Sequence, residues 1–240
     1  MKHINQFITE YIIKKKLDKP INSETTNYLY HPETKPELSK IIRKLLKDNQ
    51  TDLNVIDVSK ITNMSDLFSQ INENKKITNI DISEWDVSNV TNMENMFFGC
   101  SKFNCDLSSW NVSNVEDITG MFINCVNLNS DFSNWNMHNV TNMKYMFYGC
   151  KKFEGKGLEN WDVSNVENMS CMFQNCENFE GKGLENWDVS NVKYMDKMFS
   201  YCVNFTGKGL ENWNIRNVTR MNDIFEKCTS LKNKPSWYKE

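Results

Sequence analysis

The 240-residue chain is long enough for one large domain or two small ones, but its hydrophobic content of 39% is low for a compact globule of this size. Its formal net charge of −3 disfavours a nucleic-acid partner, because such partners usually require a basic face. The sequence has no run of about 18 apolar residues, so no membrane-spanning helix is predicted.

Two apolar stripes at helical spacing occupy the N-terminal part of the chain. The first comprises Ile4, Phe7, Ile8, Tyr11 and Ile12; the second, which has Pro36 near its start, comprises Leu38, Ile41, Ile42, Leu45 and Leu46. We therefore expect residues 1–50 to form a helical cap. Residues 51–232 are then the repeat domain, and 233–240 a C-terminal cap or tail.

A repeat with a period of about 26 residues follows the cap. Six cysteines keep the same period as the tryptophans, and each lies 15 residues after its tryptophan. Two residue types in phase over six copies indicate structural repeats that stack on one another. The tryptophans are Trp85, Trp110, Trp135, Trp161, Trp187, Trp213 and Trp237, and the cysteines are Cys100, Cys125, Cys150, Cys176, Cys202 and Cys228.

Within one copy, the alternation of apolar residues predicts a strand over residues 158–163, and three- to four-residue spacing predicts a helical turn over 167–175. A weaker first copy runs from Asp57 to Phe68, with Ile56 in the tryptophan position. The predicted fold is a leucine-rich-repeat-like solenoid of about seven coils. Each coil would combine a short parallel β-strand with a short helix or 3-10 turn, below an N-terminal helical cap.

The repeat resembles the BspA-like leucine-rich-repeat family, in its Trp/Met/Cys-rich variant found in mycoplasma-type surface proteins. The segments that carry the resemblance are residues 85–93 (WDVSNVTNM) and 96–100 (MFFGC), which recur as far as Cys228. The resemblance covers about residues 56–232. It implies a surface-exposed protein linked to adhesion or host contact, and it implies no particular reaction.

The tryptophan and cysteine columns are expected to form interior rows, because the tryptophans occupy apolar positions of the repeat and a free cysteine packs as a small hydrophobe. Stacked cysteines would also lie within disulfide range, so a disulfide stays an alternative. A metal site is the third reading, although the spacing is unlike that of zinc ligands. Cys105 and Cys171 lie off the column and are the candidates for reactive thiols. No metal and no cofactor are predicted.

Two further motifs have structural interpretations. An asparagine recurs four residues after each of six tryptophans, as in Asn165, and we expect it to be buried and to bond backbone groups. Three copies carry Gly-Lys-Gly, at Gly155, Gly181 and Gly207, but they lack the Ser/Thr and the context of a phosphate-binding P-loop. A tight turn is therefore expected there.

Polar residues between the inward positions of each predicted strand should face outward as stacked rows. A lysine row at the preceding turn, Lys156, Lys182 and Lys208, is expected to balance part of their charge. These rows form the candidate partner-binding face, and the alternative is a merely solvated surface. The candidate residues are Glu159, Asn160, Asp162, Glu185, Asn186, Asp188, Glu211, Asn212 and Asn214.

No nucleophile, base and orienting group converge in the sequence, so an enzyme is not predicted. The leading hypothesis is a non-enzymatic protein-binding module, adhesin-like or effector-like, that recognises a protein partner of unknown identity through the strand face. The alternative is a structural component of a virion or surface assembly, joined through the termini. The N-terminal residues show neither a signal peptide nor a cysteine for a lipid anchor, so a cytoplasmic or virion-associated protein is as compatible as a cell-surface one.

Overall fold

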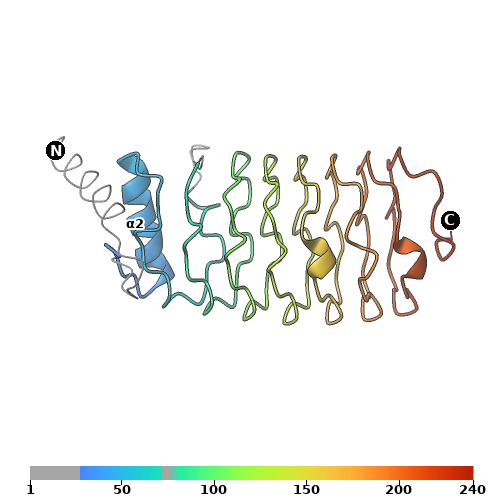
Figure 1. Ribbon diagram of the computed structural model, residues 1–240, viewed down its shortest axis with the longest axis horizontal. Coiled ribbons are helices and arrows are strands. Elements are labelled where there is room, and N and C mark those ends of the chain that lie inside the picture. Colours follow the sequence, from blue (N-terminus) through green and yellow to red (C-terminus); the bar gives the residue numbers. More distant parts are fainter. Residues whose placement is uncertain (1–27, 72–76, 78, 240) are drawn as a thin grey trace, which may run out of the picture.

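The computed structural model describes residues 28–71, 77 and 79–239. In this part of the chain the backbone winds in successive coils that follow one another along a single long axis (Figure 1). The helix α2, Lys35–Lys47, lies at the N-terminal end of the stack, and the C-terminus lies at the other end. The first predicted helical stripe, Ile4 to Ile12, falls outside the described residues.

The expected leucine-rich-repeat-like solenoid of β-strands is wrong. The described residues form no strand and no sheet, and besides α2 they contain only two short 3-10 helices, η1 (Leu158–Asn160) and η2 (Leu210–Asn212). The coils instead pair at isolated parallel bridges, most of which form one row that runs from coil to coil. This row of bridge residues is Asn63, Asn92, Asp117, Asn142, Asn168, Tyr194 and Arg220.

The predicted helical turn over 167–175 is wrong for an identifiable reason. Cys171 and Asn175 have φ of 57° and 62°, in the left-handed region, so neither can continue a right-handed helix. The segment folds into consecutive tight turns in which Met172 N–H donates to Met169 O at 3.2 Å and Cys176 N–H to Phe173 O at 3.0 Å. The same position is left-handed in seven copies: Asp66, Asn95, Gly120, Tyr145, Cys171, Lys197 and Asp223.

The intervening N–H groups of these turns join neighbouring coils. Met169 N–H donates to Tyr194 O at 2.8 Å, and Phe173 N–H donates to Met198 O at 3.0 Å. Alternate residues thus bond within their own turn and across to the next coil, which satisfies the backbone without a β-ladder. The apolar residues spaced two and three positions apart in the sequence all lie in these turns. Neither spacing therefore identified a strand or a helix.

The predicted strand over 158–163 is replaced at its start by η1. Gly157 precedes η1 with φ of 92°, and Gly209 precedes η2 with φ of 87°. A Cβ at Gly157 would collide with backbone atoms of Phe132 and Ser133 in the preceding coil. The Gly-Lys-Gly motif therefore lets the chain turn tightly against its neighbour, and only glycine tolerates this left-handed conformation at such close approach.

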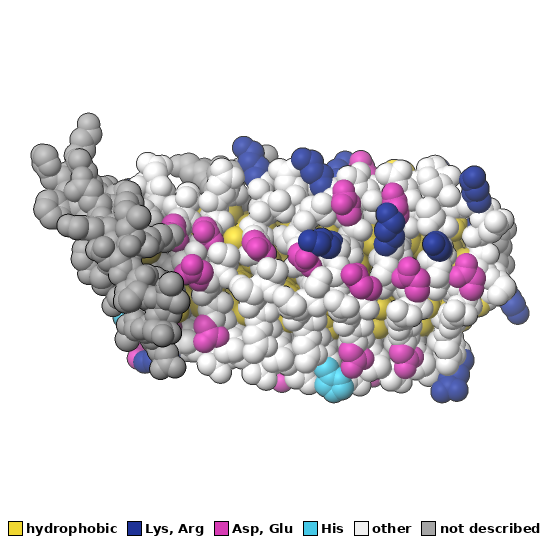
Figure 2. Space-filling view, viewed as in Figure 1, with side chains coloured by type: hydrophobic (Ala, Val, Ile, Leu, Met, Phe, Trp, Pro, Cys, Tyr) yellow, Lys and Arg dark blue, Asp and Glu magenta, His cyan; other side chains and the backbone are white. Residues whose placement is uncertain are grey.

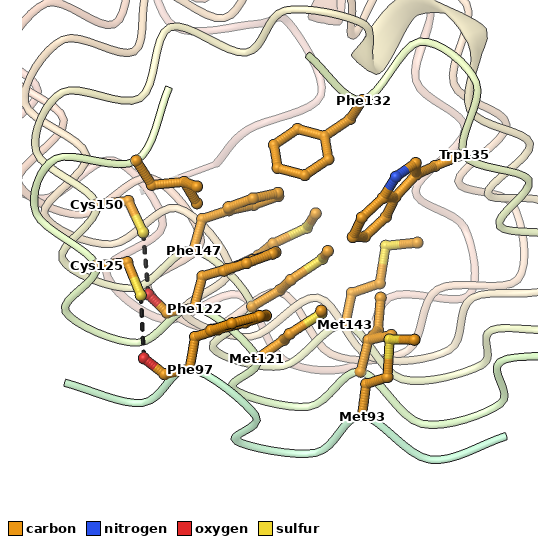
Figure 3. Packing of buried hydrophobic residues seen from close by; sticks show 14 of the residues in the cluster. Met93, Phe97, Met121, Phe122, Cys125, Phe132, Trp135, Met143, Phe147 and Cys150 are labelled. Carbon is orange, nitrogen blue, oxygen red and sulfur yellow. Dashed lines mark hydrogen bonds between the residues drawn. The ribbon is translucent and has the colours of Figure 1, made fainter. Parts of the chain in front are cut away.

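The core consists of side chains of one type stacked on their equivalents in the next coil. Rings of Phe97, Phe122 and Phe147 lie nearly parallel, with centroids 5.5 and 5.7 Å apart (Figure 3). Indoles stack in the same way, as in Trp110 on Trp135 at 6.4 Å. All six column cysteines and the tryptophans from Trp85 to Trp213 are buried, whereas Trp237 at the end is half-buried.

Helix α2 covers the first coil. Thr34 caps its N-terminus by accepting a hydrogen bond from Glu37 N–H, and Pro36 lies in its first turn. Its buried residues Leu38, Ile42 and Leu45 belong to the same apolar cluster as the coils. The second predicted stripe is thus helical and packs against the repeats.

Candidate protein-binding surface

The nine candidate partner-binding residues are all exposed, on coils that follow one another in the stack. They do not lie on a strand face, as expected from the sequence, because Glu159 and Asn160 lie in η1, Glu211 and Asn212 lie in η2, and residues 185–186 form a turn. Figure 2 shows acidic side chains in rows across several coils, with lysine or arginine side chains beside them. The surface is a set of stacked turns with polar side chains.

Three of the nine residues, those that directly follow a tryptophan, stabilise their own turn. Asp162 Oδ1 accepts from Ser164 N–H at 3.1 Å, Asp188 Oδ1 from Ser190 N–H at 2.9 Å, and Asn214 Oδ1 from Arg216 N–H at 3.4 Å. Each side chain thus forms an Asx-turn with the backbone two residues on. Hydrogen bonds from Ser164 and His138 hold the pKa of Asp162 at about 2. A structural role accounts for these three positions.

One asparagine of the candidate set also contacts a neighbouring coil. Asn160 Nδ2 donates to Ser133 O at 3.1 Å, as Asn134 Nδ2 does to Ser108 O at 3.0 Å. Asn186 and Asn212 occupy the same position in later coils and are exposed. The amide of Asn160 therefore helps to fasten its coil to the previous one, whereas Asn186 and Asn212 form no such side-chain hydrogen bond with a described residue.

The remaining three residues, Glu159, Glu185 and Glu211, form a row with one carboxylate per coil. None of the three forms an ion pair or a side-chain hydrogen bond with another described residue. We call them the glutamate row. Exposed carboxylates of this kind are free to meet a cation from another molecule.

The lysines of the Gly-Lys-Gly turns do not pair with the glutamate row, contrary to expectation. Lys156 Nζ lies 2.7 Å from Asp131 Oδ2 in the preceding coil, and Lys182 Nζ lies 2.8 Å from Glu180 Oε2. The hydrogen bond from Lys156 is the main cause that lowers the pKa of Asp131 to about 2. Glu159 acts on Lys156 only through its more distant charge.

The asparagine column behaves differently from the prediction of buried side chains. These asparagines are exposed, yet each amide donates to a backbone carbonyl of the preceding coil, as Asn165 does to His138 O at 2.9 Å. The bonds tie the coils together along one edge of the stack. The same bond is formed by Asn89, Asn114, Asn139, Asn191 and Asn217.

All eight cysteines are free thiols. Sγ of Cys125 donates to Phe97 O and that of Cys150 to Phe122 O, both at 3.1 Å (Figure 3). Burial raises the pKa of the column thiols, to about 12 for Cys100. Of the two off-column cysteines, Cys105 is half-buried and Cys171 is buried, and burial raises the pKa of both.

Sequence reasoning missed one contact on this surface. His138 Nδ1 lies 3.0 Å from Asp162 Oδ2, across adjacent coils, and both side chains are exposed. The signal was present, because His138 replaces the serine that lies two residues after Asx in most other copies, but only the stacking register places its ring beside the next coil. Asp162 is therefore committed to His138 as well as to its own turn.

Within the described part of the chain, no helix combines the length and the apolar character needed to cross a bilayer. The same residues contain no cluster of three or more His, Cys, Asp or Glu that could hold a metal ion. The surface thus consists of stacked turns, fastened by Asx and asparagine contacts, with one row of glutamates that makes no such contact.

The sequence matches one family over nearly all of the described chain. The family is described as "Mycoplasma protein of unknown function, DUF285", and the matches span residues 37–157 and 147–239. No curated protein and no solved structure matches the chain. Because the two matches together extend from residue 37 to residue 239, the chain belongs to this Mycoplasma-type family of unknown function.

Proposed function

We propose that this protein is a non-enzymatic binding module that recognises a protein partner through the glutamate row. The observation that carries the proposal is the contrast between Glu159, Glu185 and Glu211 and four of the six other candidate residues. Asp162, Asp188, Asn214 and Asn160 are engaged in turn and inter-coil hydrogen bonds, whereas the three glutamates are not.

The spacing of the row supports an extended contact rather than a pocket. Stacked rings show that the coils repeat at about the separation of the phenylalanines, 5.7 Å for Phe147 and Phe173 and 5.9 Å for Phe173 and Phe199. Carboxylates of like charge on successive coils repel one another unless they are screened or meet opposite charge. A partner segment that carries several lysines or arginines would relieve this repulsion and gain association rate from it.

The resemblance of the repeat to BspA-like sequences supports the same proposal. Members of that family are typically surface-exposed and linked to adhesion or host contact, so a binding role for the exposed rows is consistent with it. The alternative, a structural component of an assembly, would place the important contacts at the ends of the stack instead.

The test is a pull-down from the native source with wild type and with Glu159→Lys/Glu185→Lys/Glu211→Lys. We expect the variant to lose one specific partner band, because lysines in these positions would repel a basic segment. The wild-type complex should also weaken as salt rises, since the attraction is between exposed charges.

The matched control reverses three exposed carboxylates outside the row, in the variant Asp48→Lys/Glu84→Lys/Glu116→Lys. It changes the net charge equally and should retain the band. An identical set of bands for wild type and the glutamate-row variant would reject the proposed site. Loss in both variants would attribute binding to net charge and would equally reject it.

A further inference from the structure

Two parallel rows of outward residues run along the stack on the side of the tight turns. The first row holds the residue that follows each stacked phenylalanine of the core, and the second row holds the residue after that. Backbone hydrogen bonds keep the rows side by side, since Gly99 N–H donates to Ile123 O and Asn124 N–H to Tyr148 O, both at 2.7 Å. We call eight of these residues the neutral strip: Phe98, Ile123, Tyr148 and Gln174 in the first row, and Gly99, Asn124, Gly149 and Asn175 in the second.

The first row exposes aromatic and aliphatic surface. Phe98 is 45% exposed, and Ile123 and Tyr148 are half-buried. The ring of Tyr148 meets that of Tyr145 edge-on, with centroids 5.9 Å apart. Apolar side chains thus lie on the surface of three successive coils. Exposed apolar surface with a polar rim is typical of an interaction site.

Unpaired amides accompany these apolar side chains. Asn124 is exposed, Gln174 and Asn175 are half-buried, and none of the three side chains forms a hydrogen bond with another described residue. A Cβ at Gly149 would collide with Asn124 Oδ1, so this amide lies against the backbone next to Tyr148. Each free amide offers two donors and one acceptor oxygen. The strip therefore combines apolar surface with hydrogen-bonding groups that have no partner within the described chain.

The strip carries no charge, although charged side chains occupy the same two positions further along the stack. The last copy has Glu226 and Lys227 there, and Glu226 Oε2 accepts from Ser200 Oγ at 3.2 Å. Ionic partners are recognised by complementary charge. A nucleic acid, an anionic membrane or a highly charged peptide would find no such charge within the strip.

From these observations we propose that the neutral strip binds an uncharged carbohydrate chain that lies along the stack. Sugar rings present apolar C–H faces, which pack on aromatic side chains, and hydroxyl groups, which both donate and accept hydrogen bonds. Tyr148 beside Asn124 supplies a partner for each of these features. The inference is independent of the glutamate row.

Polypeptide occupants fit the strip less well. A helix bonds its own backbone groups internally, so the free amides would meet no regular series of partners. An extended peptide places its same-face side chains about 6.6–6.8 Å apart. The core phenylalanines that precede the first row repeat at 5.5 and 5.7 Å, so such a peptide would lose register along the strip.

The test applies the full chain to an array of neutral oligosaccharides that includes cellohexaose, chitohexaose, xylohexaose and maltohexaose, and measures affinities by titration calorimetry. We expect at least one hexasaccharide to bind at least about tenfold more tightly than its disaccharide, because several coils contribute contacts. The affinity should not change as salt rises, since no charge pair is involved. This salt response separates the site from the glutamate row.

Two substitutions in the strip should each weaken this binding by at least about tenfold: Tyr148→Ala, which removes a ring, and Asn124→Gly, which removes the amide and retains the left-handed turn. Tyr194→Ala, at an exposed tyrosine outside the strip, should leave the affinity intact, and so should the glutamate-row variant. Urea unfolding checks that each variant is folded.

Three outcomes would overturn the proposal. They are no binding of any neutral oligosaccharide at millimolar concentration, binding of charged glycans alone, and an affinity that both strip substitutions leave unchanged. A protein captured through the strip by a chain that binds no neutral glycan would assign the surface to a protein partner instead, and would equally overturn it.

Discussion

At the scale of single residues, a repeated position tends to form the same contact in successive coils. Five of the six column cysteines, from Cys125 to Cys228, donate the thiol to a carbonyl of the preceding coil. The tryptophan indole does the same, as in Trp135 Nε1 to Leu107 O at 3.0 Å. Buried polar atoms with such partners avoid the cost of desolvation without a bond. The two columns therefore contribute a small and a large flat hydrogen-bond donor, in addition to their apolar bulk.

The cysteine column should be inert to thiol reagents in the native state. Burial raises the pKa of Cys100 and Cys228 to about 12, so at pH 8 almost no thiolate, the reactive form, exists there. We expect half-buried Cys105 to react first when native protein is treated with iodoacetamide and mapped by mass spectrometry. Urea-unfolded protein, in which all eight thiols react, is the control. Rapid native labelling of Cys150 or Cys176 would contradict this.

At the scale of the element, the coil is built from turns whose left-handed residues are mostly not glycine. Tyr145, Cys171 and Lys197 have φ of 60°, 57° and 54°. Such residues cost about 1–2 kcal/mol each in this region. The hydrogen bonds between neighbouring coils offset that cost, so the turn conformation depends on the stack and has little support from local sequence.

Two glycines allow conformational cost to be separated from close approach. Gly157 and Gly207 have φ of 92° and 73°, so Gly→Ala at either position should cost about 1–2 kcal/mol from the left-handed backbone. A Cβ at Gly157 also meets backbone of the preceding coil, whereas at Gly207 it meets the flexible end of Leu231. We expect Gly157→Ala to destabilise by at least about 2 kcal/mol more, measured by urea unfolding. Equal losses would show that the neighbouring coil yields without cost.

At the scale of the whole molecule, the core is a set of parallel rows with contacts between adjacent coils. Phe147 stacks on Phe122 and Phe173, each at 5.7 Å. In such an architecture stability is approximately a sum of coil and neighbour terms, so a defect should act locally.

Phe147→Ala should cost about 3–5 kcal/mol, because the ring is fully buried. We expect amide exchange to accelerate mainly in residues 120–176 and much less in 200–228, as measured by hydrogen-exchange mass spectrometry. Phe199→Ala provides the reciprocal control and should affect the C-terminal coils instead. Uniform acceleration along the chain in both variants would show that the stack opens as one cooperative unit.

Much of this molecule could be read from the sequence. Residue type and spacing alone predicted the period, the apolar columns and the helix that contains residues 38–46. The columns could be predicted because a row of equivalent side chains is buried wherever equivalent coils stack. The prediction of strands and helical turns was wrong, since apolar spacing of two, three or four residues fits tight turns as well. The sequence predicted the residues of the candidate surface one by one. Nothing in it distinguished Glu159, which forms no side-chain hydrogen bond with a described residue, from Asp162, which stabilises its own turn.

What the sequence by itself determined is which residue types recur, and hence which positions form rows. Only the tertiary structure decided the conformation of Tyr145, Cys171 and Lys197, because a left-handed non-glycine residue is held by bonds to a neighbouring coil that local sequence does not encode. The same register set Lys156 against Asp131 and left the glutamate row without a partner.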